Sequence, residues 1–131
     1  MEYCGIDLHD RTSDVCILDD EGAVMERTRV STTRTALKRF FSRREPMRVA
    51  MEACGFSPWV SRLVAKCGHE VVVCNPRRVR LIAESTLKND KVDAEVLGRL
   101  VRIDPEFLRP IQHRSEEAQR LRAKLKEAFA H

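Results

Sequence analysis

The sequence predicts an α/β fold in which a mixed five-stranded sheet is flanked by helices. Two observations support this prediction. Three strand-like segments separated by short turns open the chain, and from residue 31 onward helix-like and strand-like segments alternate. A meander of three strands gives antiparallel neighbours, whereas β-α-β connections give parallel ones, so the sheet contains both. The 131 residues suffice for one domain with a buried core.

The opening meander is predicted from three apolar or alternating segments, at residues 3–8, 13–19 and 23–30. Between the second and the third lies "DDEG" at residues 19–22. Acidic residues tolerate a turn and Gly22 supplies a positive φ, so we expect a β-hairpin at this point.

The first helix is predicted at residues 31–44. Ser and Thr residues can cap its start, and Leu37, Phe40 and Phe41 lie on one helical face. Pro46 follows and prevents the helix from continuing.

A short apolar strand is predicted at residues 48–53, with Glu52 at its end. A second helix follows at residues 57–68, because Ser57 is a good N-cap, a proline stands at the first helical position and a glycine closes the segment. This helix returns the chain to the start of the next strand.

The last strand is predicted at residues 69–74, where an Asn-Pro pair ends it, and helices follow at residues 77–85 and 90–103. The element order βββαβαβα matches the ribonuclease H-like arrangement, in which the first strand lies centrally beside the fourth. Residues 113–131 are charged and free of Gly and Pro, which predicts a C-terminal helical extension.

That extension carries a narrow apolar stripe, since Leu121, Leu125 and Phe129 are spaced by four residues. A stripe of this kind buries little surface on its own. We therefore expect the helix to continue past residue 131 or to pack against another chain.

The composition is that of a soluble globular protein, with 43% hydrophobic and 34% charged residues. No apolar run approaches the roughly 18 residues of a membrane span, and the first residues do not resemble a signal peptide, so a cytoplasmic location is expected. The five cysteines form no Cys-x-x-Cys pair and suit buried, reduced thiols. Cys67, His69 and Cys74 lack a fourth ligand for zinc.

The positive charge is modest but clustered, with a net charge of +4. One cluster is Arg34, Lys38, Arg39, Arg43, Arg44 and Arg48, and a second is Arg77, Arg78 and Arg80. Such clusters suit contacts with nucleic-acid phosphates, although a solvated surface has the same composition.

Four carboxylates stand at special places. Asp7 ends the first strand, Glu52 ends the fourth, and Asp90 and Asp93 open the late helix three residues apart. In the arrangement above the two strand ends are neighbours, and an i, i+3 pair projects from one face of a helix. Converging carboxylates repel one another unless cations bind, and hard oxygen ligands suit Mg²⁺ or Mn²⁺ in phosphoryl transfer.

Each carboxylate also has a simpler explanation. Asp7 can merely end a strand, Glu52 can pair with an arginine, and Asp90 with Asp93 can form an acidic helix cap. His9 near Asp7 can contact a scissile phosphate or be an exposed loop residue. The joint placement of all four carboxylates favours the metal site.

Four motifs resemble the DEDD transposases of bacterial insertion sequences, the group that includes the Piv invertase. They are "YCGIDLHDRTSDVCILDDEG", "MEACGFSPWV", "VVVCNPRRVRLIAES" and "LKNDKVDAEVLGRL", and the resemblance runs from residue 3 to about residue 122. It implies a RuvC-like domain whose metal-binding and catalytic set is Asp7, Glu52, Asp90 and Asp93, with Mg²⁺ or Mn²⁺ as cofactor.

The resemblance also implies DNA as partner, a homo-oligomer formed through the C-terminal helix and, in some members, an element-encoded bridging RNA. On this reading residues 1–110 are the catalytic domain, and residues 111–131 begin a coiled-coil linker to a serine-bearing C-terminal domain. Candidate nucleic-acid contacts are Arg77, Arg78, Arg80, Lys88 and Lys91.

Two positions depart from the family pattern. Asp10 stands where a lysine is frequent, and Asn89 where Thr or Ser is common. Three other functions remain open from the sequence: a stand-alone RuvC-like junction nuclease, a fragment of a sugar-kinase-like ATPase, and a catalytically silent nucleic-acid-binding or oligomerisation module.

Overall fold

The computed structural model describes residues 1–87, 92–106, 108 and 124–128. Its centre is a five-stranded sheet of order β3-β2-β1-β4-β5. The strands are β1 (Glu2–Asp7), β2 (Thr12–Leu18), β3 (Val24–Ser31), β4 (Met47–Glu52) and β5 (Glu70–Cys74). The β1–β2 and β2–β3 pairs are antiparallel, while β1–β4 and β4–β5 are parallel. The predicted mixed sheet, with the first strand central beside the fourth, is confirmed.

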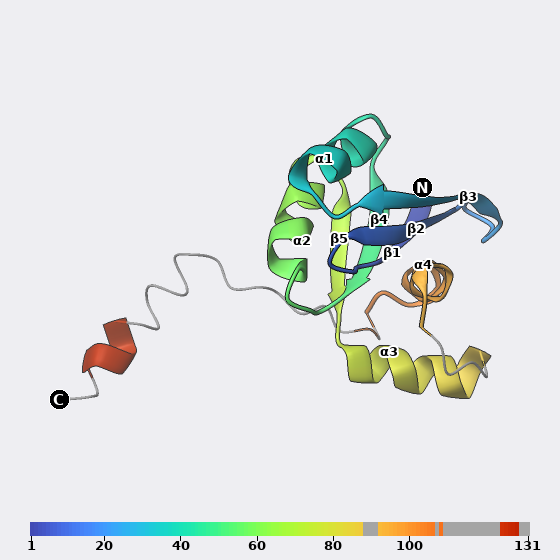
Figure 1. Ribbon diagram of the computed structural model, residues 1–131. Helices are drawn as coiled ribbons and strands as arrows, with labels where there is room; N and C mark the ends of the chain where they lie inside the picture. The colour runs from blue at the N-terminus through green and yellow to red at the C-terminus, as the bar shows by residue number, and fades with distance from the viewer. Residues whose placement is uncertain (88–91, 107, 109–123, 129–131) are drawn as a thin grey trace.

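Helices cover both faces of this sheet (Figure 1). On one face lie α1 (Arg34–Ser42) and α2 (Ser57–Lys66), which pack against each other. On the other face lie α3 (Pro76–Ile82), which continues into a π-helical turn at Ala83–Leu87, and α4 (Ala94–Ile103), which packs on β1 and β2. The ribonuclease H-like arrangement expected from the sequence is therefore present.

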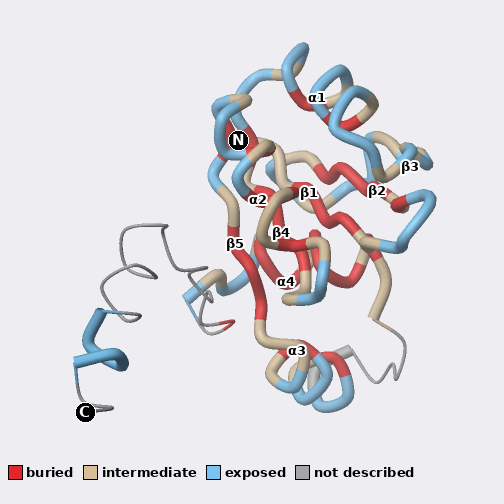
Figure 2. The backbone as a smooth tube through the Cα atoms, turned by 60° about the vertical axis from the view of Figure 1, so that its left-hand side comes forward, coloured by how far each residue is buried: buried red, intermediate tan, exposed pale blue. Residues whose placement is uncertain are grey.

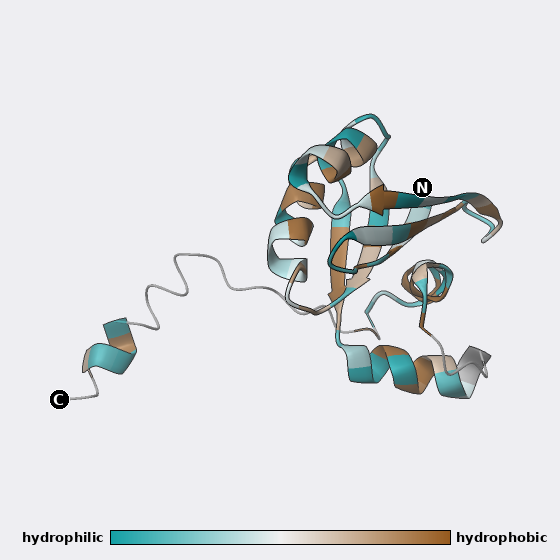
Figure 3. Cartoon of the chain, in the orientation of Figure 1, coloured by the Kyte–Doolittle hydropathy of each residue, from teal (hydrophilic) through white to brown (hydrophobic). Residues whose placement is uncertain are grey.

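The two faces of the sheet bury separate cores because side chains alternate along each strand. In β1, Cys4 and Ile6 belong to the core beneath α1 and α2, whereas Gly5 faces α4. In β4, Ala50 lies in the core beneath α3 and α4. Figure 2 shows the buried strands at the centre of the molecule. In Figure 3 the helix α1 carries both hydrophilic and hydrophobic residues, as expected of a helix with one buried face.

The predicted hairpin between β2 and β3 is confirmed. The Asp19 carboxylate accepts hydrogen bonds from the backbone N–H groups of Glu21 and Ala23, both at 2.9 Å. Gly22 adopts a φ of +88°, which a residue with a side chain rarely adopts. The local chemistry of the turn thus sets the pairing of the two strands.

The starts of the first two helices differ in how well they were predicted. The Thr33 hydroxyl caps α1 by accepting from the N–H of Ala36 at 3.2 Å, as expected of a Ser/Thr cap. The expected N-cap of α2 at Ser57 is wrong by one residue, because Ser57 is the first helical residue and Phe56 holds the cap position. The Ser57 hydroxyl instead bonds the backbone of Cys54.

The expected start of the late helix at residue 90 is wrong. The helix α4 begins at Ala94, and Asp93 is its N-cap, with its carboxylate accepting from the N–H of Val96 at 3.0 Å. Asp93 therefore precedes α4 and is not one of its helical residues. Asp90 itself lies outside the described residues.

Most of the C-terminal extension also lies outside the described residues. Residues 124–128 form a short exposed helix. The domain boundary near residue 110 and the stripe of Leu121, Leu125 and Phe129 therefore remain predictions. None of the helices in the described ranges has the length and apolar character of a membrane-spanning segment.

Candidate metal centre at the ends of β1 and β4

Asp7 and Glu52 lie at the ends of two neighbouring strands. In the parallel β1–β4 pair Ile6 is opposite Met51, so each carboxylate is the next residue of its strand. The alternation that turns Gly5 and Ala50 toward α4 turns Asp7 and Glu52 the same way. Both side chains are half-buried. The structure therefore brings these two predicted residues together.

Asp93 approaches the same edge from α4. It lines a cavity of about 540 Å³ together with Asp7. A second cavity, of about 170 Å³, is lined by Asp7 and Glu52. Asp7 thus borders both cavities, and three of the four predicted carboxylates surround one edge of the sheet. Asp90, the fourth predicted carboxylate, lies outside the described residues, as do Lys88 and Lys91.

The position of Asp93 follows from the close packing of α4 on β1. An added Cβ on Gly5 would lie 2.6 Å from the backbone nitrogen of Gly98 and closer still to the carbonyl oxygen of Ala94. Real Cβ atoms do not approach backbone atoms that closely, so only glycine fits here. Because Ala94 follows Asp93 directly, this contact also holds the N-cap carboxylate near the end of β1.

Asp14 is a further carboxylate at this edge that was not included in the predicted set. The antiparallel register places Asp14 directly opposite Asp7. One ligand atom from each of Asp7, His9 and Asp14 lies within 4.8 Å of the others. The His9 Nε2 is 3.2 Å from the Asp7 carboxylate, and the His9 side chain is 58% exposed, as expected for a loop histidine.

The carboxylates at the centre of the site repel each other, and this repulsion is only partly offset. Burial raises the pKa of the Glu52 carboxyl, the charge of Asp7 raises it further, and Arg80 lowers it. Across the described part of the chain, neither Asp7 nor Glu52 forms an ion pair with a lysine or an arginine. A bound cation would offset this repulsion.

The carboxylates at the rim of the site are, in contrast, paired with arginines. Asp14 accepts from Arg29 at 2.9 Å. Glu95 accepts from Arg99 at 3.0 Å and also pairs with Arg27 of β3. A hydrogen bond from Arg99 lowers the pKa of the Glu95 carboxyl most, and a second one from Arg27 lowers it further. The acidic centre is therefore surrounded by neutralised pairs.

The predicted basic contacts on α3 lie on the same side of the sheet. Arg77 and Arg80 are exposed and Arg78 is half-buried. Arg80 is near enough to Glu52 for its charge to act on that carboxyl. Of the three, Arg80 is the one that the structure relates to the carboxylates.

The cysteines and His69 do not form a zinc site within the described residues. His69 is buried, its Nδ1 accepts from the N–H of Met47 at 3.0 Å, and its Nε2 donates to the carbonyl of Phe41 at 2.7 Å. Neither ring nitrogen is left for a metal. Burial, together with the charge of Glu52, raises the pKa of the Cys74 thiol to about 12, so this thiol is inert.

Three serines that lie on α2 and in the π-helical turn after α3 bond the backbone of the domain. The hydroxyl of Ser57 bonds Cys54, that of Ser61 donates to the carbonyl of Pro58 at 3.1 Å, and that of Ser85 donates to the carbonyl of Leu81 at 2.9 Å. None of the three adjoins a general base in these contacts. Contacts with the backbone therefore account for these three hydroxyls.

A comparison with protein families gives one match that covers nearly the whole chain. The sequence model of a transposase family, the IS110-type DEDD transposases, matches residues 4–127. The chain is 33% identical over 93 residues to the transposase for insertion sequence element IS1328 of Yersinia enterocolitica, across 71% of this chain and 27% of that protein. It is 36% identical over 69 residues to the putative transposase y4pF/y4sB of Sinorhizobium fredii, across 53% of this chain and 18% of that protein.

The chain therefore spans about a quarter or less of the length of these relatives. Two solved structures are also similar to it. Thermus thermophilus RuvC has 18% identity and a TM-score of 0.48, over 90% of this chain and 87% of that one. Inorganic polyphosphate/ATP-glucomannokinase from Arthrobacter sp. strain KM has 20% identity and a TM-score of 0.43, over 69% and 50%.

Proposed function

The chain belongs to the IS110-type DEDD transposase family, and from this premise we propose that it forms the catalytic domain of a transposase that cleaves and transfers DNA strands at the ends of β1 and β4. The observation that carries the proposal is the convergence of Asp7, Glu52 and Asp93 on one edge of the sheet. The three residues come from three separate segments of the chain. Helix capping accounts for Asp93 but not for the other two.

The donor atoms at this edge fit a divalent cation. They are carboxylate oxygens, the hard ligands that Mg²⁺ and Mn²⁺ prefer, and Asp7 and Glu52 lack a Lys or Arg partner among the described residues. We propose that Asp7, Glu52 and Asp93, joined by Asp90, would hold Mg²⁺ or Mn²⁺. Such an ion would supply charge stabilisation for the oxygens that gain negative charge during phosphoryl transfer.

The chain's own cations orient the substrate in this proposal. Arg77, Arg78 and Arg80 on α3 would contact phosphates of the DNA, and the effect of the Arg80 charge on Glu52 supports this for Arg80. Lys88 and Lys91 are proposed to do the same from the segment that precedes α4. His9, whose Nε2 lies 3.2 Å from the Asp7 carboxylate, would also contact a phosphate oxygen. Contacts of this kind fix the position of the backbone rather than read its sequence.

We further propose that residues 1–110 are one part of a composite active site. Residues 111–131 would begin a helical linker to a serine-bearing domain, and oligomers would form through that helix. The relatives are several times longer than this chain, which supports a further domain. A bridging RNA that selects the DNA, and a location in the bacterial cytoplasm, belong to the same proposal.

The proposed metal site is tested by thermal unfolding of the 131-residue chain with and without Mg²⁺ or Mn²⁺. We expect either ion to raise the Tm, because an ion that binds only the folded state stabilises it by mass action. The double substitution Asp7→Ala with Asp90→Ala should abolish the rise. A matched change of two exposed carboxylates, Asp10→Ala with Glu45→Ala, should leave it intact. A wild-type Tm that is insensitive to both metals would contradict the proposal.

The composite active site is tested by cleavage of branched DNA. The isolated chain should not cleave a four-way junction in Mg²⁺ or recombine DNA, whereas the full-length protein should recombine its DNA substrate. Efficient cleavage of the junction by residues 1–131 alone would favour a stand-alone junction nuclease instead.

A further inference from the structure

A second basic surface lies on the face of the sheet opposite α4. The helices α1 and α2 lie side by side there (Figure 1), and an open groove of about 960 Å³ follows the line between them. The cationic side chains that line it are Arg34, Lys38, Arg39, Arg43, Arg62 and Lys66. Among the described residues, no Asp or Glu lines this groove.

None of these six cations takes part in an ion pair with any described carboxylate. Their neighbours show that such pairs form readily elsewhere in the fold, since Arg44 binds Glu26 through two hydrogen bonds and Arg48 binds Glu70. Six like charges without counter-charges repel one another, and an anionic partner would relieve that repulsion.

The spacing of the cations suits a polymer of anions rather than a single ion. On α1, Arg34 and Lys38 are four residues apart, and the same interval separates Arg39 from Arg43, the C-cap of α1. On α2 it separates Arg62 from Lys66. Four helical residues rise about 6 Å, so each pair lies one above the other along the groove. Both walls therefore carry successive positive charges.

Trp59 belongs to the groove but is not a free platform for a base. It is half-buried, and the guanidinium of Arg34 lies over its ring at 5.2 Å from the centroid. This contact holds Arg34 at the mouth of the groove. The recognition offered by the groove is thus electrostatic, directed to phosphates and not to bases.

Both helices begin at the edge of the sheet where the carboxylates lie. The helix α2 follows the end of β4, which carries Glu52. The helix α1 follows β3, and just before it the Thr32 hydroxyl donates to the carbonyl of His9 at 2.7 Å. The groove therefore starts near the carboxylate edge and leads away from it.

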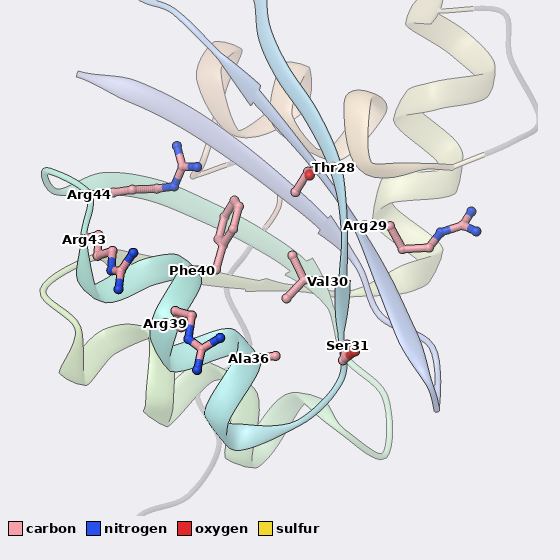
Figure 4. A pocket seen from close by; sticks show the side chains of 9 residues that line it. All are labelled: Thr28, Arg29, Val30, Ser31, Ala36, Arg39, Phe40, Arg43 and Arg44. Carbon is pink, nitrogen blue, oxygen red and sulfur yellow. The ribbon is translucent and has the colours of Figure 1, made fainter.

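The basic surface extends past α1 toward β3. Figure 4 shows a second hollow there, of about 620 Å³, in which Arg39 and Arg43 project from α1 beside Phe40. These two arginines line both hollows. They are consequently the cations best placed to contact a strand that crosses α1.

We propose that the groove between α1 and α2 binds the phosphate backbone of the DNA that flanks the reacting strand. The identity of the polymer rests on the proposed transposase function, whereas the binding itself requires no metal. The groove would hold the DNA in place while the carboxylate edge acts on it.

The proposal is tested by the fluorescence anisotropy of a labelled DNA duplex titrated with the 131-residue chain in EDTA. Arg39→Glu with Arg43→Glu should weaken binding by roughly tenfold or more. The plot of log affinity against log salt has a negative slope, which should become less steep by about 0.9 for each phosphate that the variant no longer neutralises. The control is Arg102→Glu on α4, whose guanidinium donates to the backbone carbonyl of Asp20 at 3.0 Å and does not line the groove; its change in net charge is half that of the double variant. It should lose at most a small part of the affinity.

Several outcomes would overturn the proposal. They are an unchanged affinity in the groove variant, an equal loss in the control, and tighter binding of an RNA duplex of the same sequence. If the glutamate variant loses its far-UV circular dichroism, Arg39→Gln with Arg43→Gln gives the same test without introducing negative charge. Because the titration contains EDTA, its result does not depend on whether the carboxylates bind a metal. Failure of the proposed metal site would instead be seen as a Tm that does not respond to Mg²⁺ or Mn²⁺.

Discussion

Gly5 of β1 and Gly98 of α4 meet backbone to backbone. An added Cβ on Gly98 would lie 3.3 Å from the backbone nitrogen of Gly5, and one on Gly5 would lie 2.6 Å from the backbone nitrogen of Gly98. This contact lets α4 lie directly on the central strand. It places Asp93, the cap of α4, beside the cavity that Asp7 also lines.

Substitution of Gly5 by alanine should separate α4 from β1. The new methyl group would meet the backbone of Ala94 and Gly98, which cannot rotate away, and we expect a loss of about 3 kcal/mol or more in the free energy of unfolding. Gly55→Ala is the matched control, because nothing lies within 4 Å of a Cβ there. Urea unfolding measures both variants, and similar stabilities for the two would contradict the close packing.

Replacement of His69 by leucine should destabilise the fold by about 2–4 kcal/mol. It leaves the N–H of Met47 and the carbonyl of Phe41 buried without their partner, and each such group costs about 1–3 kcal/mol. His69→Gln, whose amide can keep one of the two bonds, should lose less. If leucine were tolerated as well as glutamine in thermal unfolding, the two hydrogen bonds would not hold β4 and α1 to the turn after α2.

Glu95→Gln should lower stability at neutral pH but not in acid. Hydrogen bonds from Arg99 and Arg27 lower the pKa of Glu95 in the folded state. Its contribution is therefore present above the unfolded pKa and disappears as the pH falls through the folded pKa. We expect a difference of roughly 0.2–1 kcal/mol at pH 7, the scale of partly exposed ion pairs.

The measurement is the free energy of unfolding of wild type and variant across the acid range. Glu45→Gln removes an exposed carboxylate that has no ion pair with a described cation, and it should show no such pH-dependent difference. A gap between wild type and Glu95→Gln that persists unchanged in acid would rule out the linkage.

Glu52→Gln should raise the free energy of unfolding at neutral pH in the absence of metal, whereas Glu95→Gln lowers it. Burial and the charge of Asp7 raise the pKa of Glu52 in the fold, so the ionised form is costly, and stability falls as the pH rises from the unfolded to the folded pKa. The neutral amide removes this cost, and we expect a gain of roughly 0.2–1 kcal/mol at pH 7 in EDTA. The gain should vanish in acid. A loss of stability at neutral pH would show that the Glu52 charge is already compensated.

The sequence predicts the strands well because their patterns depend on local chemistry. Alternation along β1 and β4 determines which of their side chains face α4, and the parallel pairing of the two strands brings Asp7 and Glu52 together. The start of α4 is harder to predict. Asp90 and Asp93 are both good caps, and the contact of Ala94 with Gly5, which fixes the observed start, involves residues far apart in the chain.

Asp14 could have been found from the sequence. In an antiparallel pair the sum of opposing residue numbers is constant, so a hairpin centred between residues 10 and 11 places residue 14 opposite Asp7. The groove between α1 and α2 could not have been found from the sequence. Its cations come from two helices, and only the packing of those helices brings Arg62 and Lys66 beside the cluster on α1.

The central claim is that the carboxylates at the ends of β1 and β4 bind a divalent cation, and isothermal titration calorimetry with Mn²⁺ tests it most directly. The wild-type chain should bind Mn²⁺ with a saturable heat, and Asp7→Asn should abolish it. Asp10→Asn makes the same chemical change in the neighbouring loop and should leave it in place. An Asp7→Asn chain that is folded and binds Mn²⁺ as tightly as the wild type would contradict the claim.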